Sequence, residues 1–274
     1  MIVARSIAGV RAALRQADDA GAPARPLGFV PTMGALHDGH LTLVGAARAA
    51  CGRVAASIFV NPAQFNDAAD LAAYPRDEAR DASLLERAGV DVLFLPEAPE
   101  VYPPGFATWV EAGGVADGYE GQYRPGHFRG VATVCLKLFH IIRPDVAYFG
   151  QKDAQQVAVI RQLVRDTNLD LRVDVVPTVR DADGLAMSSR NVRLSRDARQ
   201  QALAIPRALS AALEARQRGT DPVEAARQAL AGLDVEYAGV AMFDDAPTMV
   251  VAVRVGGIRL IDNVPLDRPA MAGL

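Results

Sequence analysis

The sequence predicts an α/β protein: a Rossmann-like, doubly wound parallel sheet, followed by a second, smaller α+β domain. Through residue 177, short apolar runs alternate with helical patterns. The apolar runs are continuous, which is typical of parallel strands covered on both faces. Beyond that point the pattern changes to long helices and then three short strands. We therefore expect one domain over residues 1–177 and a smaller one over residues 178–274.

The elements of the first part follow from apolar spacing and from the residues that interrupt it. Gly21 and Gly89 end two helices, and Asn61-Pro62 ends a strand. The segment 96–128 is rich in proline and glycine and has no sustained period, so we expect a long functional loop. The expected strands are 27–30, 53–60, 91–95, 145–149 and 171–176, and the expected helices are 7–21, 41–50, 76–88, 131–142 and 153–168.

The second part begins with a polar loop and an alanine-rich pattern that predicts one long helix over 195–218. A shorter helix is expected over 222–230. Strands are expected at 235–240, 249–255 and 257–261, with Gly256-Gly257 as a hairpin turn.

Composition limits the class of protein. Half of the 274 residues are hydrophobic, which is ample for packed cores, and 22% are charged with a net charge of −3, so there is no basic excess for nucleic acid. Cys51 and Cys135 are not spaced as metal ligands, and we expect no protein metal site. Neither a signal sequence nor a run of eighteen apolar residues is found, so we expect a cytoplasmic protein without membrane association.

The segment from Pro31 to His40 reads as a turn from a strand into a helix. The first N–H groups of a helix lack internal partners and carry the positive end of its dipole, so phosphate binds there readily. Gly34 and Gly39 allow close approach, and His37 and His40 can donate hydrogen bonds or move a proton. The alternative is a solvated loop that holds two histidines. We favour an anion site because two of the chain's four histidines lie three positions apart on this turn.

A second strand-to-helix turn is Gly150-Gln151-Lys152-Asp153. Asp153 can cap the following helix, Gly150 admits close approach, and the Lys152 ammonium can follow charge on a phosphate. A solvated surface lysine is the alternative reading. We favour the functional one because of the predicted position of the turn.

Two further segments offer polar groups. Met187-Ser188-Ser189-Arg190-Asn191 supplies two hydroxyls and a guanidinium, a suitable clamp for terminal phosphates. The Asn61-Pro62-Ala63-Gln64 segment places side-chain amides just after a strand, although Asn-Pro is also a common turn signal without any function.

The turn at 37–40 resembles the HxGH signature of the nucleotidylyl-transferase superfamily. The longer string Pro-Thr-Met-Gly-Ala-Leu-His-Asp-Gly-His resembles the pantothenate synthetase (pantoate–β-alanine ligase) family. Matches at 61–65, 120–130, 150–156 and 177–191 extend this resemblance over nearly the whole chain. Segment 187–191 resembles the mobile phosphate loop of the superfamily without the lysine of its KMSKS form, as is usual in this family.

The resemblance implies ATP-dependent condensation of pantoate with β-alanine to pantothenate through a pantoyl adenylate, with release of AMP and pyrophosphate. It implies catalytic roles for His40, His37 and Lys152, and substrate binding by Gln64 and Gln156. The implied ATP-binding residues are Met33, Gly34, Ala35, Leu36, His37, Asp38, Gly39, His40, Gly150, Gln151, Lys152, Asp153, Val179, Met187, Ser188, Ser189 and Arg190.

The same resemblance implies Mg²⁺ bridging the phosphate oxygens, small-molecule partners only, and a homodimer. Two other classes remain. A different nucleotidylyl transferase, such as a phosphopantetheine adenylyltransferase, would keep the adenylate on its product. A nucleotide-binding regulator would have an inactive site, against which the intact His37, His40, Lys152 and Arg190 argue.

Overall fold

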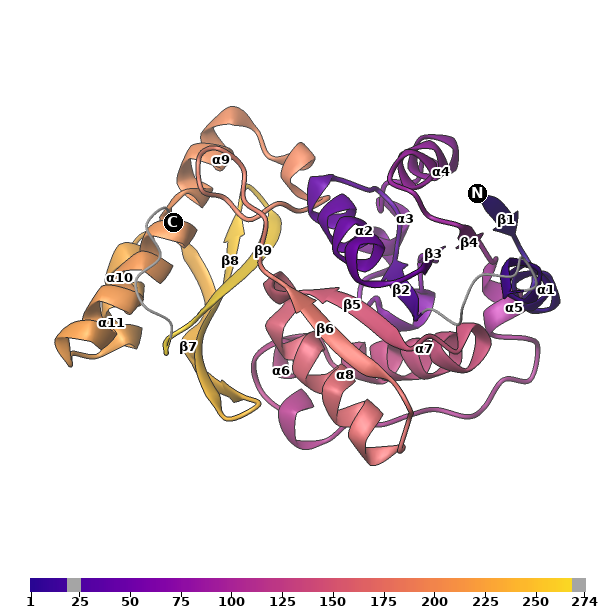
Figure 1. Ribbon diagram of the computed structural model, residues 1–274. Helices are drawn as coiled ribbons and strands as arrows, with labels where there is room; N and C mark the ends of the chain where they lie inside the picture. The colour runs from indigo at the N-terminus through magenta and orange to yellow at the C-terminus, as the bar shows by residue number, and fades with distance from the viewer. Residues whose placement is uncertain (19–25, 268–274) are drawn as a thin grey trace. The chain divides into compact units, whose positions relative to one another are not determined.

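The computed structural model describes residues 1–18 and 26–267 (Figure 1). By its internal contacts the chain forms two compact units. The first comprises Met1–Gly150 and Val159–Val176, and the second comprises Gln151–Ala158 and Pro177–Leu274.

The first unit is built on one sheet of six parallel strands in the order β1-β4-β3-β2-β5-β6. The chain adds strands outward from β2 in one direction and then returns to add β5 and β6 on its other side. A switch point, where ligands bind in sheets of this kind, therefore lies between β2 and β5. The strands are β1 (Ile2–Ala4), β2 (Leu27–Thr32), β3 (Arg53–Ile58), β4 (Val92–Phe94), β5 (Val146–Gly150) and β6 (Arg172–Val176).

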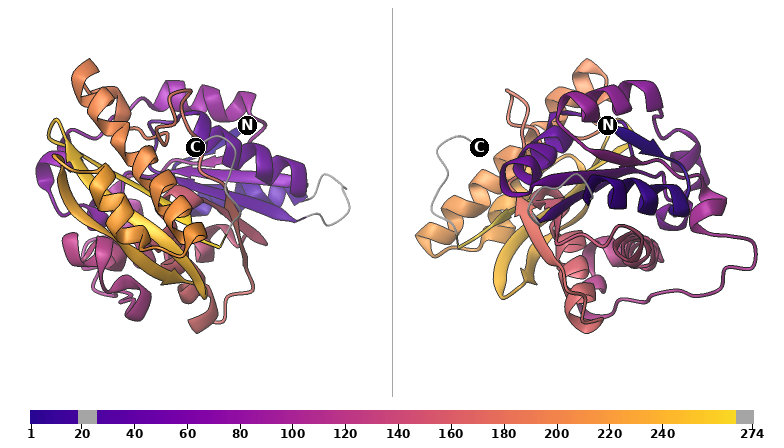
Figure 2. Two further views of the ribbon diagram at one scale, coloured as in Figure 1. Left: turned by 90° about the vertical axis from the view of Figure 1, so that its left-hand side faces the viewer. Right: turned by 45° about the vertical axis from the view of Figure 1, so that its right-hand side comes forward.

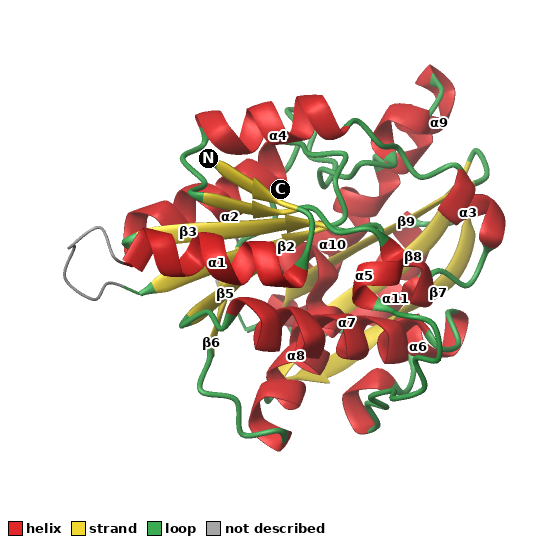
Figure 3. Ribbon diagram, turned by 90° about the vertical axis from the view of Figure 1, so that its right-hand side faces the viewer, coloured by secondary structure: helices red, strands yellow, loops and turns green. Residues whose placement is uncertain are grey.

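Helices cover both faces of this sheet, as the doubly wound prediction requires. Figure 3 shows α2 and α4 on one face and α1 and α7 on the other. The predicted end of the first helix at Gly21 lies outside the described residues. The helices are α1 (Ile7–Asp18), α2 (Asp38–Ala50), α3 (Ala68–Ala72), α4 (Glu78–Arg87), α5 (Ala98–Val101), α6 (Tyr119–Tyr123), α7 (His127–Ile142) and α8 (Ala154–Asp166), of which residues 154–158 belong to the second unit.

The structure differs from the prediction in three places of this unit, of which the first is the short helix α3, which was not predicted. Strand β1 was not predicted because it is a three-residue edge strand whose Ile2 and Val3 side chains are 41% and 48% exposed, so it has no buried apolar run. The segment 96–128 is irregular over much of its length, but it also contains the short helices α5 and α6.

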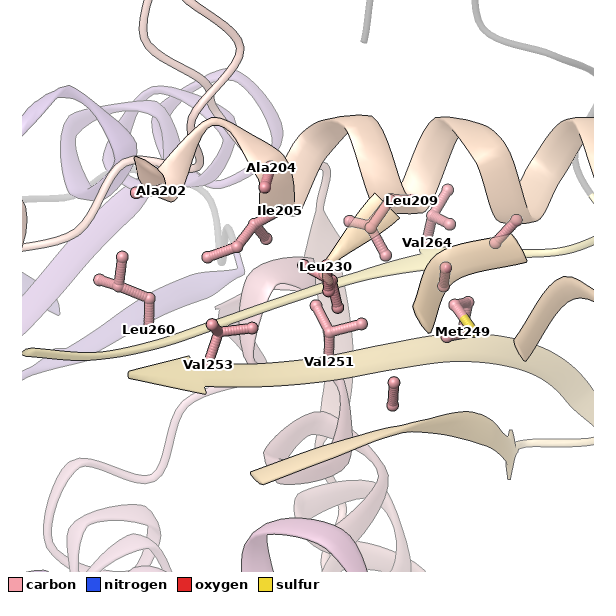
Figure 4. Close-up of a cluster of buried hydrophobic side chains, with 14 of the residues drawn as sticks. Ala202, Ala204, Ile205, Leu209, Leu230, Met249, Val251, Val253, Leu260 and Val264 are labelled. Atoms are coloured by element: carbon pink, nitrogen blue, oxygen red, sulfur yellow. The ribbon is translucent and has the colours of Figure 1, made fainter. Parts of the chain in front are cut away.

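The second unit confirms the smaller α+β fold. Strands β7 (Asp234–Phe243), β8 (Ala246–Val255) and β9 (Ile258–Pro265) form an antiparallel sheet. Helices α10 (Ala204–Arg218) and α11 (Pro222–Ala229) lie against one face of it (Figure 2). Alternate strand residues such as Val251, Val253 and Leu260 meet Ile205 and Leu209 of α10 in a continuous apolar core (Figure 4).

The single helix predicted over 195–218 is wrong. The structure has α9 (Arg196–Ala202) and α10, with Leu203 between them. The cause is Pro206, which has no N–H to donate to the carbonyl of Ala202 four residues earlier. The predicted hairpin turn is confirmed: Gly256 and Gly257 join β8 to β9 with φ of 56° and 76°.

Across residues 1–18 and 26–267, no helix combines the length and the apolarity that are needed to cross a bilayer.

Candidate active site

The turn after β2 places two imidazoles at the start of α2. His37 is the residue immediately before the helix and His40 lies in its first turn, with ring centroids 4.2 Å apart. The backbone N–H of His37 donates to Nδ1 of His40 at 3.4 Å. Because Nδ1 accepts, the neutral His40 ring carries its proton on Nε2, which can donate it to a bound group. The helix dipole and the two imidazoles together offer the kind of groups that bind an anion.

Asp81 of α4 holds the backbone of this turn. Its carboxylate is 1% exposed and accepts hydrogen bonds from the N–H groups of Ala35 at 2.7 Å and Leu36 at 2.9 Å. Gly34 has a φ of +81°, and a Cβ there would lie 3.0 Å from Asp81 Oδ2. Sequence reasoning missed Asp81, because an acidic residue in a helix among other charges usually faces solvent.

The turn lies at the switch point of the sheet. Phe29 of β2 is paired with Ala147 of β5, and the two strands run on from this pair to end at Thr32 and Gly150. A Cβ built on Gly150 would meet no described atom within 4 Å. The carboxyl end of β5 is therefore open to a ligand, as expected for such a crevice.

Gln64 is oriented by a chain of buried amide and hydroxyl groups. The Tyr102 hydroxyl donates to Asn61 Oδ1 at 2.9 Å, Asn61 Nδ2 donates to Gln64 Oε1 at 2.9 Å, and Gln64 Nε2 donates to the sulfur of Met33 at 3.0 Å. Burial raises the pKa of Tyr102 well above its usual range, so the hydroxyl remains a donor. The N–H groups of the Gln64 amide thus face Met33, which belongs to the turn from Pro31 to His40.

The segment matched at 120–130 holds the Gln64 backbone. Arg124 can only donate, so His127 Nε2 accepts from it at 3.2 Å, and His127 Nδ1–H donates to the Gln64 carbonyl at 2.9 Å. A Cβ on Gly130 would come within 2.3 Å of the Ala63 carbonyl oxygen, so only glycine lets α7 approach this closely.

The second unit contains the Lys152 turn. Lys152 lies in a short 3-10 helix, η3 (Gln151–Asp153), with its Nζ 3.7 Å from Asp153 Oδ1. In the helix that follows, Gln155 is buried and Gln156 is half-buried. Of these two amides Gln156 is the more accessible to a ligand.

The same unit contains the predicted phosphate clamp. Met187 donates its backbone N–H to the Val179 carbonyl at 2.9 Å, which brings together the two ends of the loop of residues 179–187. Residues 188–191 form a turn in which the Asn191 N–H donates to the Ser188 carbonyl at 3.0 Å. Nearby, the Arg199 guanidinium binds Asp183 and holds the pKa of that carboxyl below its ordinary value.

The structure thus distributes the predicted residues over the two units. Met33 to His40, Gln64 and Gly150 belong to the first; Gln151 to Asp153, Gln156, Val179 and Met187 to Arg190 belong to the second. Burial raises the pKa of Cys135 to about 12, so its thiol stays protonated at neutral pH. The groups present suit the binding of anions and proton donation to them.

The fold and this paired-histidine turn at a helix N-terminus define an α/β enzyme of the HxGH nucleotide-binding class. The family model for pantoate-β-alanine ligase matches residues 2–265. The chain belongs to this family and is an acid–amino-acid ligase.

Two relatives agree with this assignment over most of the chain. Pantothenate synthetase of Heliobacterium modesticaldum is 52% identical over 259 residues, covering 89% of this chain and 92% of the relative. That of Cereibacter sphaeroides is 48% identical over 279 residues, covering 96% and 99%.

Solved structures give the same result. Pantothenate synthetase of Thermus thermophilus superposes with a TM-score of 0.89 at 43% identity, over 97% of this chain and 99% of the other. Pantoate-β-alanine ligase of Francisella tularensis, complexed with β-γ ATP and β-alanine, gives a TM-score of 0.83 at 34% identity, over 99% and 100%.

Proposed function

We propose that this ligase performs the reaction of its family, the ATP-dependent condensation of pantoate with β-alanine, in two steps. A carboxylate oxygen of pantoate attacks the α-phosphorus of ATP, and pyrophosphate leaves. The amine of β-alanine then attacks the acyl carbon of pantoyl adenylate. The bond between this carbon and the phosphate oxygen breaks, and AMP leaves with that oxygen. The observation that carries the proposal is the Asp81-held turn with two imidazoles at a helix N-terminus. The nucleotide and β-alanine in the Francisella tularensis relative support it.

The first step brings two anions together, so the work of the site is positioning and charge compensation. His37 and His40 bind phosphate oxygens, and His40 donates a proton to one of these oxygens. Lys152 stabilises charge on the transferring phosphate. Ser188, Ser189 and Arg190 hold the β- and γ-phosphates.

The remaining predicted residues surround these groups in the proposed complex. Gln64 and Gln156 bind pantoate through its carboxylate or hydroxyls. The nucleotide is lined by Met33, Gly34, Ala35, Leu36, Asp38, Gly39, Gly150, Gln151, Asp153, Val179 and Met187.

Mg²⁺ fits this site as a partner of the phosphates. Within the described ranges, no three His, Cys, Asp or Glu side chains gather as ligands for an ion. Mg²⁺ keeps several waters and commonly takes few protein ligands together with substrate phosphates. It would therefore be held mainly by the β- and γ-phosphate oxygens and would neutralise their charge.

The assembly of the protein is a further part of the proposal. Residues 1–177 hold nucleotide and pantoate, and residues 178–274 close over the site. A smaller radius of gyration in X-ray scattering when ATP and pantoate are added would support this closure.

We also propose that the protein acts as a homodimer in the cytoplasm, where the free thiols Cys51 and Cys135 stay reduced. A sedimentation mass near 29.1 kDa, that of one chain, would exclude the dimer.

Exchange of labelled pyrophosphate into ATP tests the proposed reaction. We expect exchange that requires pantoate, without β-alanine, and AMP release only after β-alanine is added. A phosphopantetheine adenylyltransferase would keep its adenylate in the final product, and an inactive regulator would show no exchange. Either result would overturn the proposal.

Replacing Tyr102 by phenylalanine should raise the KM for pantoate about tenfold, equivalent to one buried hydrogen bond. The ring packing against Phe106 and Trp109 is kept, but the donor to Asn61 is lost, so the Gln64 amide loses its fixed orientation. The KM for ATP should be unchanged. Tyr237→Phe, at a half-buried tyrosine of β7 in the second unit, is the matched control. An equal rise in both KM values would contradict this role of Tyr102.

A further inference from the structure

A buried asparagine on β9 holds the turn that carries Lys152. Asn263 is 4% exposed. Its Nδ2 donates to the backbone carbonyl of Gln151 at 2.9 Å and to that of Lys152 at 2.8 Å. All three residues belong to the second unit.

The contacts determine how the Asn263 amide is oriented. Two carbonyl oxygens converge on one nitrogen, which has two N–H groups to offer. The amide oxygen in turn accepts from Gln151 Nε2 at 3.2 Å. The flipped orientation would set an oxygen against two carbonyls. Only a side chain with two donors satisfies this turn, because aspartate would repel the carbonyls and leucine would leave them without partners.

Asp262, the neighbour of Asn263, extends this network to the loop of residues 179–187, which contains the proposed nucleotide residues Val179 and Met187. Asp262 is on the face of β9 that Leu260 and Val264 turn toward α10, and its carboxylate binds Arg180 at 2.6 Å. The same carboxylate accepts the backbone N–H of Asn263 at 2.8 Å. Arg180 directly follows Val179, and its guanidinium also donates to the Gly184 carbonyl at 3.1 Å. Two adjacent residues of β9 therefore brace both the Lys152 turn and the loop of residues 179–187.

We propose that Asn263 is a positioning residue for adenylate formation, which fixes the Gln151–Lys152 backbone so that the Lys152 ammonium is held ready for the transferring phosphate. The inference rests on the proposed function of Lys152. The reason for a strong effect is geometric, since a misplacement of about 1 Å in a catalytic group can cost about 100-fold in rate.

The test is a double-mutant cycle, measured as pantoate-dependent pyrophosphate exchange in the full chain. Asn263→Ala should lower the exchange rate about 10- to 100-fold. In a Lys152→Ala background the same substitution should cost less than about twofold, because its effect acts through the ammonium. Thr248→Val is the control: Thr248 is also buried in this sheet, and its loss should leave exchange unchanged in both backgrounds.

A second variant covers the case in which Asn263→Ala does not fold. Asn263→Asp has nearly the same shape, and its carboxylate faces two carbonyls. Its exchange rate relative to the unsubstituted chain should be low at pH 8 and recover in part as the pH falls, because the protonated acid offers one O–H donor for the two carbonyls. A ratio that does not change with pH would contradict the proposal.

The outcomes separate this inference from the proposed function. Unchanged exchange in Asn263→Ala, or an equal loss in both backgrounds, would overturn the role of Asn263 and leave that of Lys152 intact. Normal exchange in Lys152→Ala alone would instead overturn the proposed role of the lysine.

Discussion

Replacing Lys152 by alanine should lower the rate of adenylate formation at least ~100-fold, comparable to the loss of one oxyanion donor. The first step joins two anions, and the ammonium is proposed to stabilise the charge that develops on the transferring phosphate. The measurement is pantoate-dependent pyrophosphate exchange at saturating ATP and pantoate. Under these conditions a loss of rate reports the transition state and not weaker binding.

The chain supplies a matched control for this substitution, because it has only two lysines. The Lys137 ammonium lies 4.6 Å from the centroid of the Phe106 ring, in a cation–π contact. Lys137→Ala should keep exchange within about twofold, since it removes a contact of modest strength. Near-normal exchange in Lys152→Ala would refute the catalytic role of Lys152.

Replacing His40 should reduce the exchange rate about 100-fold, the lower range for loss of a general acid. His40 Nδ1 accepts the His37 N–H, so Nε2 is the atom that carries the proton to be donated. His40→Asn retains a side chain that can accept at this helix position but has no acid, and His40→Ala removes both functions. The two variants should therefore lose similar catalytic rates.

Binding of ATP and the catalytic rate must be measured separately for these variants. We expect the dissociation constant for ATP to change less than the exchange rate. His140→Ala, at an exposed histidine in the last turn of α7, should behave as the unsubstituted chain does. If the His40 variants bind ATP poorly but form adenylate at the normal rate, His40 is a binding residue and not a proton donor.

The strand-to-helix turns were predictable because their signals are local. Strands β2 and β5 are apolar runs that end in glycine-containing turns, and the same turns contain the histidines and Lys152. The break before α10 also had a local signal, since Pro206 lies inside the alanine-rich pattern. Pro206 is the third residue of α10, but the apolar pattern continues on both sides of it and therefore reads as one helix.

The residues that position the site were not predictable in this way. Asp81, Tyr102 and Asn263 contact residues 46, 41 and 111 positions away. Such contacts depend on the order of strands and on which side chains share a face. Asp262 and Asn263 read as a polar interruption at the end of an apolar strand, whereas the fold buries both.

The proposed binding of pantoate by Gln64 has a consequence for selectivity among hydroxy acids, because the orientation of the Gln64 amide is fixed. Asn61 occupies its oxygen, so the buried amide can only donate to a molecule beside it, and the Met33 sulfur is a weak competitor for those protons. An analogue without an oxygen at that place would leave an N–H without an acceptor, at a cost of about 1–3 kcal/mol. Discrimination against acids of similar shape would then come from the fixed dipole of the Gln64 amide and not from the size of the binding site.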